Sequence, residues 1–105
     1  MIEATVCRAI RNGLLLEVVY ANCWRVIAEP HVLGRSAAGH DILLCWQVEP
    51  IVRAGISPWQ FFHLRHVTGL QVLQRFQLPE GGRNTPLDEF SSIYVINTSI
   101  PQGGV

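Results

Sequence analysis

The sequence NGLLLEVVY at residues 12–20 decides the fold. Asn-Gly is a strong turn signal, and the run that follows it, Leu14 to Tyr20, is rich in residues that favour a β-strand. Further apolar runs separated by turn residues continue as far as Phe76, which predicts a small antiparallel barrel of five strands. The predicted strands cover residues 14–20, 24–30, 42–49, 59–67 and 69–76.

A short helix is predicted before this turn, from Ile2 to Asn12. Ile2, Val6 and Ile10 recur every four residues and form one apolar face, and Gly13 supplies a C-terminal stop. We expect the helix to cover one end of the barrel. The predicted fold class is therefore mainly β with one short N-terminal helix.

Three positions interrupt the strand pattern. Pro30 lacks a ladder donor and predicts an edge, a bulge or the end of a strand. A loop is expected from Gly34 to Gly39. Thr68-Gly69 is predicted to be a tight connection, which would make the last two barrel strands antiparallel neighbours.

Alternation along the predicted strand 59–67 divides its side chains between two faces. Phe62 and Leu64 are expected to face the core. Phe61 then shares the other face with His63 and Arg65, which makes it the best candidate for an exposed aromatic platform.

Composition limits the classes of function. The chain has 105 residues, 49% of them hydrophobic, and a formal net charge of zero, so no global field draws it to nucleic acid or to an anionic membrane. All eight basic residues are arginine, and residues 1–76 hold seven of them against five acids. Arginine suits phosphate binding and stacking on bases, although a GC-rich genome would produce the same bias.

The three cysteines, Cys7, Cys23 and Cys45, are odd in number and widely spaced, so neither a disulfide framework nor a zinc site is expected. A reducing cytoplasm fits this pattern. No apolar run is long enough for a membrane span, and Glu3 stands where a signal peptide would carry positive charge.

Residues 77–105 are predicted to form an extension that packs on the barrel or on a partner subunit. It begins with a Pro-Glu-Gly-Gly linker at residues 79–82, and the sequence from Thr85 to Asp88 predicts a helix of one or two turns. A strand is predicted from Ser92 to Asn97, paired with an edge of its own barrel or of a second copy, and residues 101–105 are expected to be disordered.

No catalytic constellation stands out. His63 and His66 would lie on opposite faces of a strand, which disfavours a joint metal site and favours polar surface positions. Cys45 in an apolar strand resembles a buried structural thiol more than a nucleophile. The chain is therefore not expected to be an enzyme or to hold a metal or cofactor.

The aromatic side chains leave two interpretations open. They could form a platform for stacked bases, with Arg25 and Arg65 nearby, or they could fill the core and an oligomer interface. The residues concerned are Trp24, Trp46, Trp59, Phe61 and Phe62.

The order of these features resembles a known bacterial module. The residues that carry the likeness are Ala9-Ile10 before the turn, Tyr20, Arg25-Val26 followed by Pro30, Leu43-Leu44, Phe62-His63-Leu64, and Gly69-Leu70-Gln71-Val72-Leu73. Over about two thirds of the chain it is similar to the WYL domain, an Sm-like, SH3-type barrel commonly appended to transcription regulators.

The resemblance implies ligand contacts at Arg25, Gln60 and His66. Gln60 and His66 stand where the family usually has arginines, and Asp41-Ile42-Leu43 stands where its name would place Trp-Tyr-Leu. Alternation instead exposes His63 and Arg65. The combined set of candidate ligand-binding residues is Arg25, Trp46, Gln60, Phe61, His63, Arg65 and His66.

The function expected from these features is a noncatalytic regulatory module that senses a nucleotide or a short single-stranded nucleic acid. It would act as a homo-oligomer or beside a separate DNA-binding protein. The alternative is a structural protein, an Sm-like oligomer that acts through a protein partner.

Overall fold

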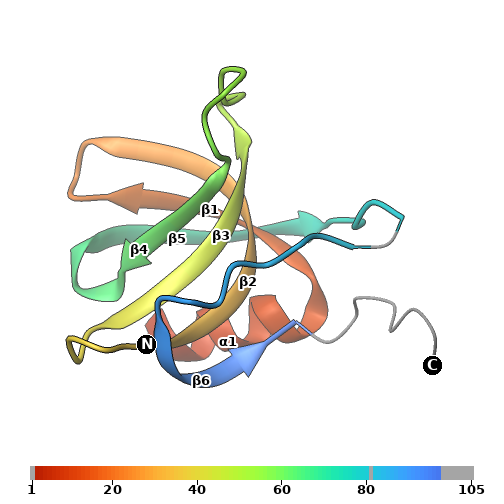
Figure 1. Cartoon of the computed structure of the whole chain (residues 1–105). Coiled ribbons are helices and arrows are strands. Elements are labelled where there is room, and N and C mark those ends of the chain that lie inside the picture. The colour runs from red at the N-terminus through yellow and green to blue at the C-terminus, as the bar shows by residue number, and fades with distance from the viewer. Residues whose placement is uncertain (1, 81, 98–105) are drawn as a thin grey trace.

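The computed structural model of the protein describes residues 2–80 and 82–97. Over this range the chain forms one α-helix, one 3-10 turn and six strands, and the strands make a single antiparallel sheet (Figure 1). The prediction of a mainly β fold with one N-terminal helix is confirmed. The elements are α1 (Ile2–Asn12), β1 (Leu14–Tyr20), β2 (Trp24–Ser36), β3 (Asp41–Glu49), β4 (Trp59–His63), the 3-10 turn Leu64–His66, β5 (Val67–Arg75) and β6 (Phe90–Ile96).

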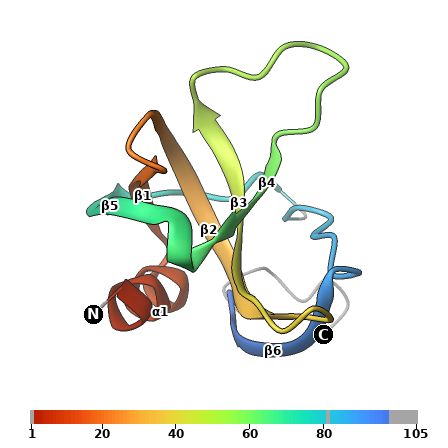
Figure 2. The ribbon, with the colours of Figure 1, turned by 90° about the vertical axis from the view of Figure 1, so that its left-hand side faces the viewer.

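The strands follow the order β4-β3-β2-β1-β5, and β6 pairs with β2. The sheet is strongly curved, and α1 lies across one end of it (Figure 2). The helix ends as the sequence predicts, because Gly13 has a φ of 64° and its N–H bonds to the carbonyl of Ile10. Val6 and Ile10 on the predicted apolar face are fully buried.

β2 is longer than predicted and continues through Pro30. Pro30 pairs with Cys45 and Val32 pairs with Leu44, so His31 is an extra residue in a β-bulge. The bulge interrupts the ladder hydrogen bonds, which is why a proline is tolerated inside this strand. The predicted start of the following loop, at residue 34, is therefore wrong, since β2 ends only at Ser36.

The connection between β4 and β5 also differs from the prediction. The strand expected over 59–67 ends at His63, and a 3-10 turn follows it. Leu64 and Val67 are both buried, and this spacing of three suits a 3-10 turn, in which side chains three apart lie above one another. Thr68-Gly69 lies inside β5, which pairs with β1, whereas β4 pairs with β3.

One core cluster draws side chains from α1, the 3-10 turn and all six strands. Phe62 is fully buried and Leu64 is buried in this cluster, as alternation predicted. Burying a side chain of this size contributes about 1.5–3 kcal/mol. β6 enters the same core through Val95.

The extension pairs with its own sheet. β6 is antiparallel to residues 32–36 of β2, so the predicted C-terminal strand is present and pairs within the chain. The helix predicted from Thr85 is absent, and the chain makes only a turn at Asp88 and Glu89. The Thr85 hydroxyl donates to the carbonyl of Arg83 rather than capping a helix, and a helix of one turn has too few hydrogen bonds to persist. The predicted disordered end, residues 101–105, lies outside the described residues.

Among the described residues, no helix has the length and apolar character that a membrane-spanning segment requires.

Candidate functional site

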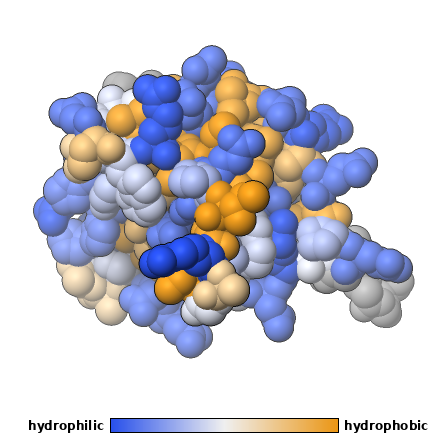
Figure 3. Space-filling view, turned by 90° about the horizontal axis from the view of Figure 1, so that it is seen from above, coloured by the Kyte–Doolittle hydropathy of each residue, from blue (hydrophilic) through white to orange (hydrophobic). Residues whose placement is uncertain are grey.

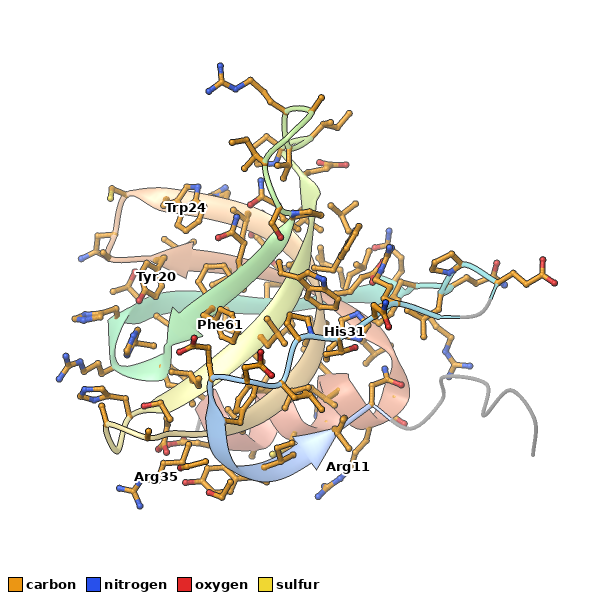
Figure 4. The ribbon with its side chains drawn as sticks, viewed as in Figure 1. Arg11, Tyr20, Trp24, His31, Arg35 and Phe61 are labelled. Atoms are coloured by element: carbon orange, nitrogen blue, oxygen red, sulfur yellow. The ribbon has the colours of Figure 1, made fainter. Side chains whose placement is uncertain are left out.

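Five aromatic rings follow one another in space along the side of the molecule that carries the β1–β2 and β2–β3 turns. The centroid distances between successive rings are 6.2, 5.8, 6.2 and 5.2 Å. We call this set the aromatic row; its members in order are Trp24, Tyr20, His66, His63 and His40. Tyr20 and Trp24 project together from neighbouring strands (Figure 4).

The β1–β2 turn positions the first two rings. Ala21 and Asn22 both have positive φ, 53° and 60°, a conformation that is costly for alanine. The turn is held by hydrogen bonds to the segment that begins β5, from the Ala21 N–H to the carbonyl of His66 and from the Asn22 N–H to the hydroxyl of Thr68. These bonds link the turn to the 3-10 turn and so fix Trp24 relative to His66.

The 3-10 turn brings two histidines together that the sequence placed apart. His63 and His66 were predicted on opposite faces of a strand, but their rings lie 6.2 Å apart because β4 ends at His63. The N–H of His63 donates to the Tyr20 hydroxyl (3.2 Å), which connects β4 to β1. Arg65, between the two histidines, is exposed.

His40 was not among the predicted site residues. It follows the turn Ala37–Gly39, and β3 pairs Ile42 with His63, so the register of two hairpins places it beside the end of β4. A prediction of strand register would have found it. Within the described chain, no group of three or more His, Cys, Asp or Glu side chains has the arrangement of a metal site.

Cavities lie on both sides of the His40–His63 pair. One of about 450 Å³ is lined by Arg65 and also by Glu3 and Asp41. The other, of about 430 Å³, is lined by Phe61, Asp88 and Glu89. The side chains that can carry positive charge, Arg65 and the histidines, therefore lie along the row, and carboxylates line the two cavities beside it.

The pKa of His63 lies below its ordinary value of 6.5. Partial desolvation is the largest cause, followed by the positive charges of His40, Arg65 and His66. At neutral pH this imidazole is therefore neutral, and a bound anion would favour its protonated form.

Phe61 is not the exposed platform that alternation suggested. Its ring is half-buried and lies 6.1 Å from that of Phe90, the first residue of β6. The extension covers it, and the sequence could not show this because the contact joins residues 29 positions apart.

Arg25 lies apart from the aromatic row. Its guanidinium is 3.9 Å from the carboxylate of Glu17 on β1, and it lines a separate cavity with Glu49 and Pro50. The side chain is 69% exposed, so this ion pair is weak. The structure therefore does not bring Arg25 together with the 3-10 turn.

Trp46 and Gln60 belong to a third region. The Trp46 ring is covered by the guanidinium of Arg83, whose central carbon is 3.8 Å from the ring centroid, and Trp59 packs edge-on against it. The Gln60 side chain donates to that of Gln47 (3.1 Å). Arg83 therefore occupies a face of the Trp46 ring, and the Gln60 amide is engaged with Gln47.

The same guanidinium reaches a buried carboxylate. Arg83 bonds through Nε and Nη2 to the two oxygens of Glu29, at 2.8 and 2.9 Å, and His31 Nε2 donates to one of them at 3.0 Å. Glu29 and His31 are 4% and 1% exposed. Both lie where β2 changes partner, because β1 pairs only as far as Ala28 and β6 begins at Val32.

Burial alone would raise the pKa of Glu29, but hydrogen bonds and charge from Arg83 and His31 lower it below 4.5. Sequence reasoning did not find this cluster. A glutamate beside a proline in an apolar strand was its one visible signal, and Arg83 lies 54 residues away.

Cys45 lies close to this cluster. Burial, and then the negative charge of Glu29, raise the pKa of the Cys45 thiol far above its ordinary value of 9.0. The side chain is fully buried and stays protonated, so it packs as a small apolar group.

Comparison of the chain with protein-family models, with curated proteins and with solved structures finds no match.

Proposed function

We propose that the protein is a noncatalytic ligand-sensing module that binds a nucleotide or a short single-stranded nucleic acid along the aromatic row, in a transcription-regulation setting. The observation that carries the proposal is the juxtaposition of five rings with exposed Arg65. Aromatic side chains beside a cationic group are the usual means of holding unpaired bases and their phosphates.

Not every ring of the row can stack on a base. Tyr20 is nearly perpendicular to both neighbours, at 84° to Trp24 and 78° to His66. Trp24 is 38% exposed and has the largest π-face of the row. It is therefore the principal stacking residue in this proposal, and Tyr20 supports it from the side.

The charges favour a small ligand. Arg65 is the permanent cation of the row, and the histidines add charge only when protonated. The carboxylates in the flanking cavities repel a long phosphate chain. A ligand with one to three phosphates in contact fits this balance.

The proposed module is a WYL-like, SH3-type barrel. β4 and β5 stand at opposite ends of the strand order and are joined by three residues of 3-10 turn, so the end of β4 lies close to the start of β5, which supports a closed barrel. The aromatic row crosses this point. A separate DNA-binding protein would then respond to whether the module has bound its ligand.

The expected result for Arg65→Ala and for Trp24→Ala is a loss of binding free energy of about 1–3 kcal/mol each. Arg65→Lys retains charge but not the planar fork, so we expect only partial recovery. The measurement is titration with labelled short DNA, RNA and common nucleotides at low salt. The slope of log affinity against log salt should lie between about −1 and −2, because few phosphates are neutralised.

Arg53→Ala is the matched control, since Arg53 is exposed on the loop between β3 and β4. It should leave affinity unchanged. Affinity should also rise as the pH falls below 6.5, where His63 gains its proton. Absence of saturable binding below about millimolar ligand would overturn the proposal.

The alternative, an assembly protein, rests on a different observation. β6 exposes Ile93 (42%) and Tyr94 (51%), and Ile96 lies on the same strand (37%). The loop between β3 and β4, at the opposite end of the molecule from β6 (Figure 1), separately exposes Ile51 and Ile56, and apolar side chains reach the surface among polar ones in the view onto that loop (Figure 3). Exposed apolar groups on a strand suit an interface with a second copy.

If β6 forms that interface, Ile93→Lys should convert an oligomer into single chains. Ile51→Lys makes the same change at an exposed isoleucine of the β3–β4 loop and should leave the oligomer intact. Sedimentation equilibrium at micromolar concentration measures both. A wild-type protein that sediments as single chains rules out the assembly function.

A further inference from the structure

We propose that Glu29 and Trp46 form an arginine-recognition site, which Arg83 of the same chain fills here and which an arginine in an extended segment of a partner protein fills in its place. The site lies beneath residues 77–80 and 82–89, which we call the strap. His31, labelled in Figure 4, lies behind the strap and away from Tyr20 and Trp24 of the aromatic row. The inference is therefore independent of the proposed nucleotide site.

The site contains the two elements that guanidinium recognition needs. Both oxygens of Glu29 accept hydrogen bonds from Arg83, at 2.8 and 2.9 Å, in the parallel geometry that a planar fork allows. The central carbon of the same group lies over the Trp46 ring, 3.8 Å from its centre. An ammonium group can meet the charge but cannot make both contacts at once.

The walls of the site are already in place. His31 donates to Glu29 and fixes its carboxylate, and its ring packs edge-on against Trp59 at 5.2 Å. Trp59 in turn packs edge-on against Trp46 at 5.1 Å. These residues belong to β2, β3 and β4, so the sheet holds the site whether or not the strap is present.

The strap is built to be exchanged. Its described residues, 77–80 and 82–89, form no helix or strand, and the hydrogen bonds that they make to the sheet come from Arg83. The Arg83 side chain keeps 17% of its surface exposed, so the site opens to solvent. A competing arginine can therefore approach without unfolding the sheet.

The partner segment should resemble the strap. It is an extended stretch of chain with one arginine, because the site accepts the strap in irregular, extended form. The tethered Arg83 competes at the effective concentration of a short linker, on the order of millimolar, so the strap acts as an inhibitor in cis. A partner must exceed that competition to bind.

The test uses a fluorescent peptide that copies residues 79–89 and a second peptide with lysine at position 83. Full-length Arg83→Ala should bind the arginine peptide at least about tenfold more tightly than wild type, because its site is free of the tethered competitor. The lysine peptide should bind at least about tenfold more weakly than the arginine peptide. Adding Glu29→Gln to Arg83→Ala should remove binding.

Wild-type protein provides an arm that does not depend on the stability of the variant. At high concentration the fluorescent arginine peptide should bind wild type with a rise in its anisotropy, and the lysine peptide should not; Trp46→Phe should weaken that binding. If Arg83→Ala does not fold, Arg83→Met is used in the titration instead. Methionine keeps an apolar side chain over Trp46 but lacks the guanidinium.

Three results would overturn the proposal. Equal binding of the two peptides would show that the site does not read guanidinium. No binding to a folded Arg83 variant, together with no response of wild type, would show that Arg83 has only a structural role. A dimer whose formation requires Arg83 would show that a second copy, rather than a partner protein, exchanges its strap.

Discussion

Replacing Arg83 by alanine is expected to lower the free energy of unfolding by about 3–5 kcal/mol. The change removes two hydrogen bonds and the positive charge from Glu29, whose side chain is almost completely buried. A buried carboxylate without a partner costs far more than an exposed ion pair contributes. Urea denaturation of the two proteins at neutral pH measures the difference.

The double variant Glu29→Gln, Arg83→Ala should recover much of this loss, because the buried carboxylate charge that Arg83 compensates is then removed as well. Arg53→Ala removes an arginine from the exposed β3–β4 loop and should change stability by less than about 0.5 kcal/mol. An Arg83→Ala protein as stable as wild type would mean that water reaches Glu29 when the strap moves away.

The same cluster sets an acid limit on stability. The pKa of Glu29 in the folded protein is lower than the ordinary value of 4.5 that it has in the unfolded chain. The unfolded chain therefore takes up the proton first, so this contribution is complete above pH 4.5 and is lost as the pH falls through the folded value. Wild type should lose more stability than Glu29→Gln between about pH 5 and pH 3.

Gly34→Ala is expected to release β6 from the sheet and to cost about 2–3 kcal/mol. A methyl group at Gly34 would overlap the carbonyl oxygen of Ser92 and would lie 2.7 Å from Cδ1 of Phe90. The first of these is backbone, so β6 as a whole has to shift. Thermal denaturation measures the cost, and amide exchange of residues 90–96 shows whether the strand has separated.

Gly69→Ala is the matched control, because it also places a methyl group on a strand. There the nearest atoms belong to the Val19 side chain at 3.2 Å, which can adjust. We expect a change below about 1 kcal/mol and no added exchange in β6. Equal effects of the two substitutions would show that the close approach of β6 to Gly34 is not what holds the strand.

Local pattern was sufficient for the elements themselves. The spacing of Val6 and Ile10 and the glycine after them set the bounds of α1, and the turn before Leu14 set the start of β1. Alternation identified Phe62 as a core residue. These features depend on neighbours within a few positions, so the sequence alone determines them.

The alternation pattern gave the wrong strand bounds where one segment contacts different partners along its length. The proline in β2 is accommodated because the strand bulges there and exchanges β1 for β6. β4 stops at His63 because Leu64 and Val67 both turn toward the core. Alternation assumes one partner along the whole strand, and neither segment meets that condition.

The candidate sites were decided by tertiary structure. His63, Arg65 and His66 were visible in the sequence, but their alignment with Tyr20 depends on a turn fastened to β5. Glu29 and Arg83 meet across 54 positions, and their pairing turns Trp46 from a free platform into the wall of an occupied site. The sequence determined which side chains could stack or carry charge. Only the packed sheet decided which of them face each other, because a charge pair or a ring contact needs short distances between side chains. Residues far apart in the sequence reach those distances only when the chain folds.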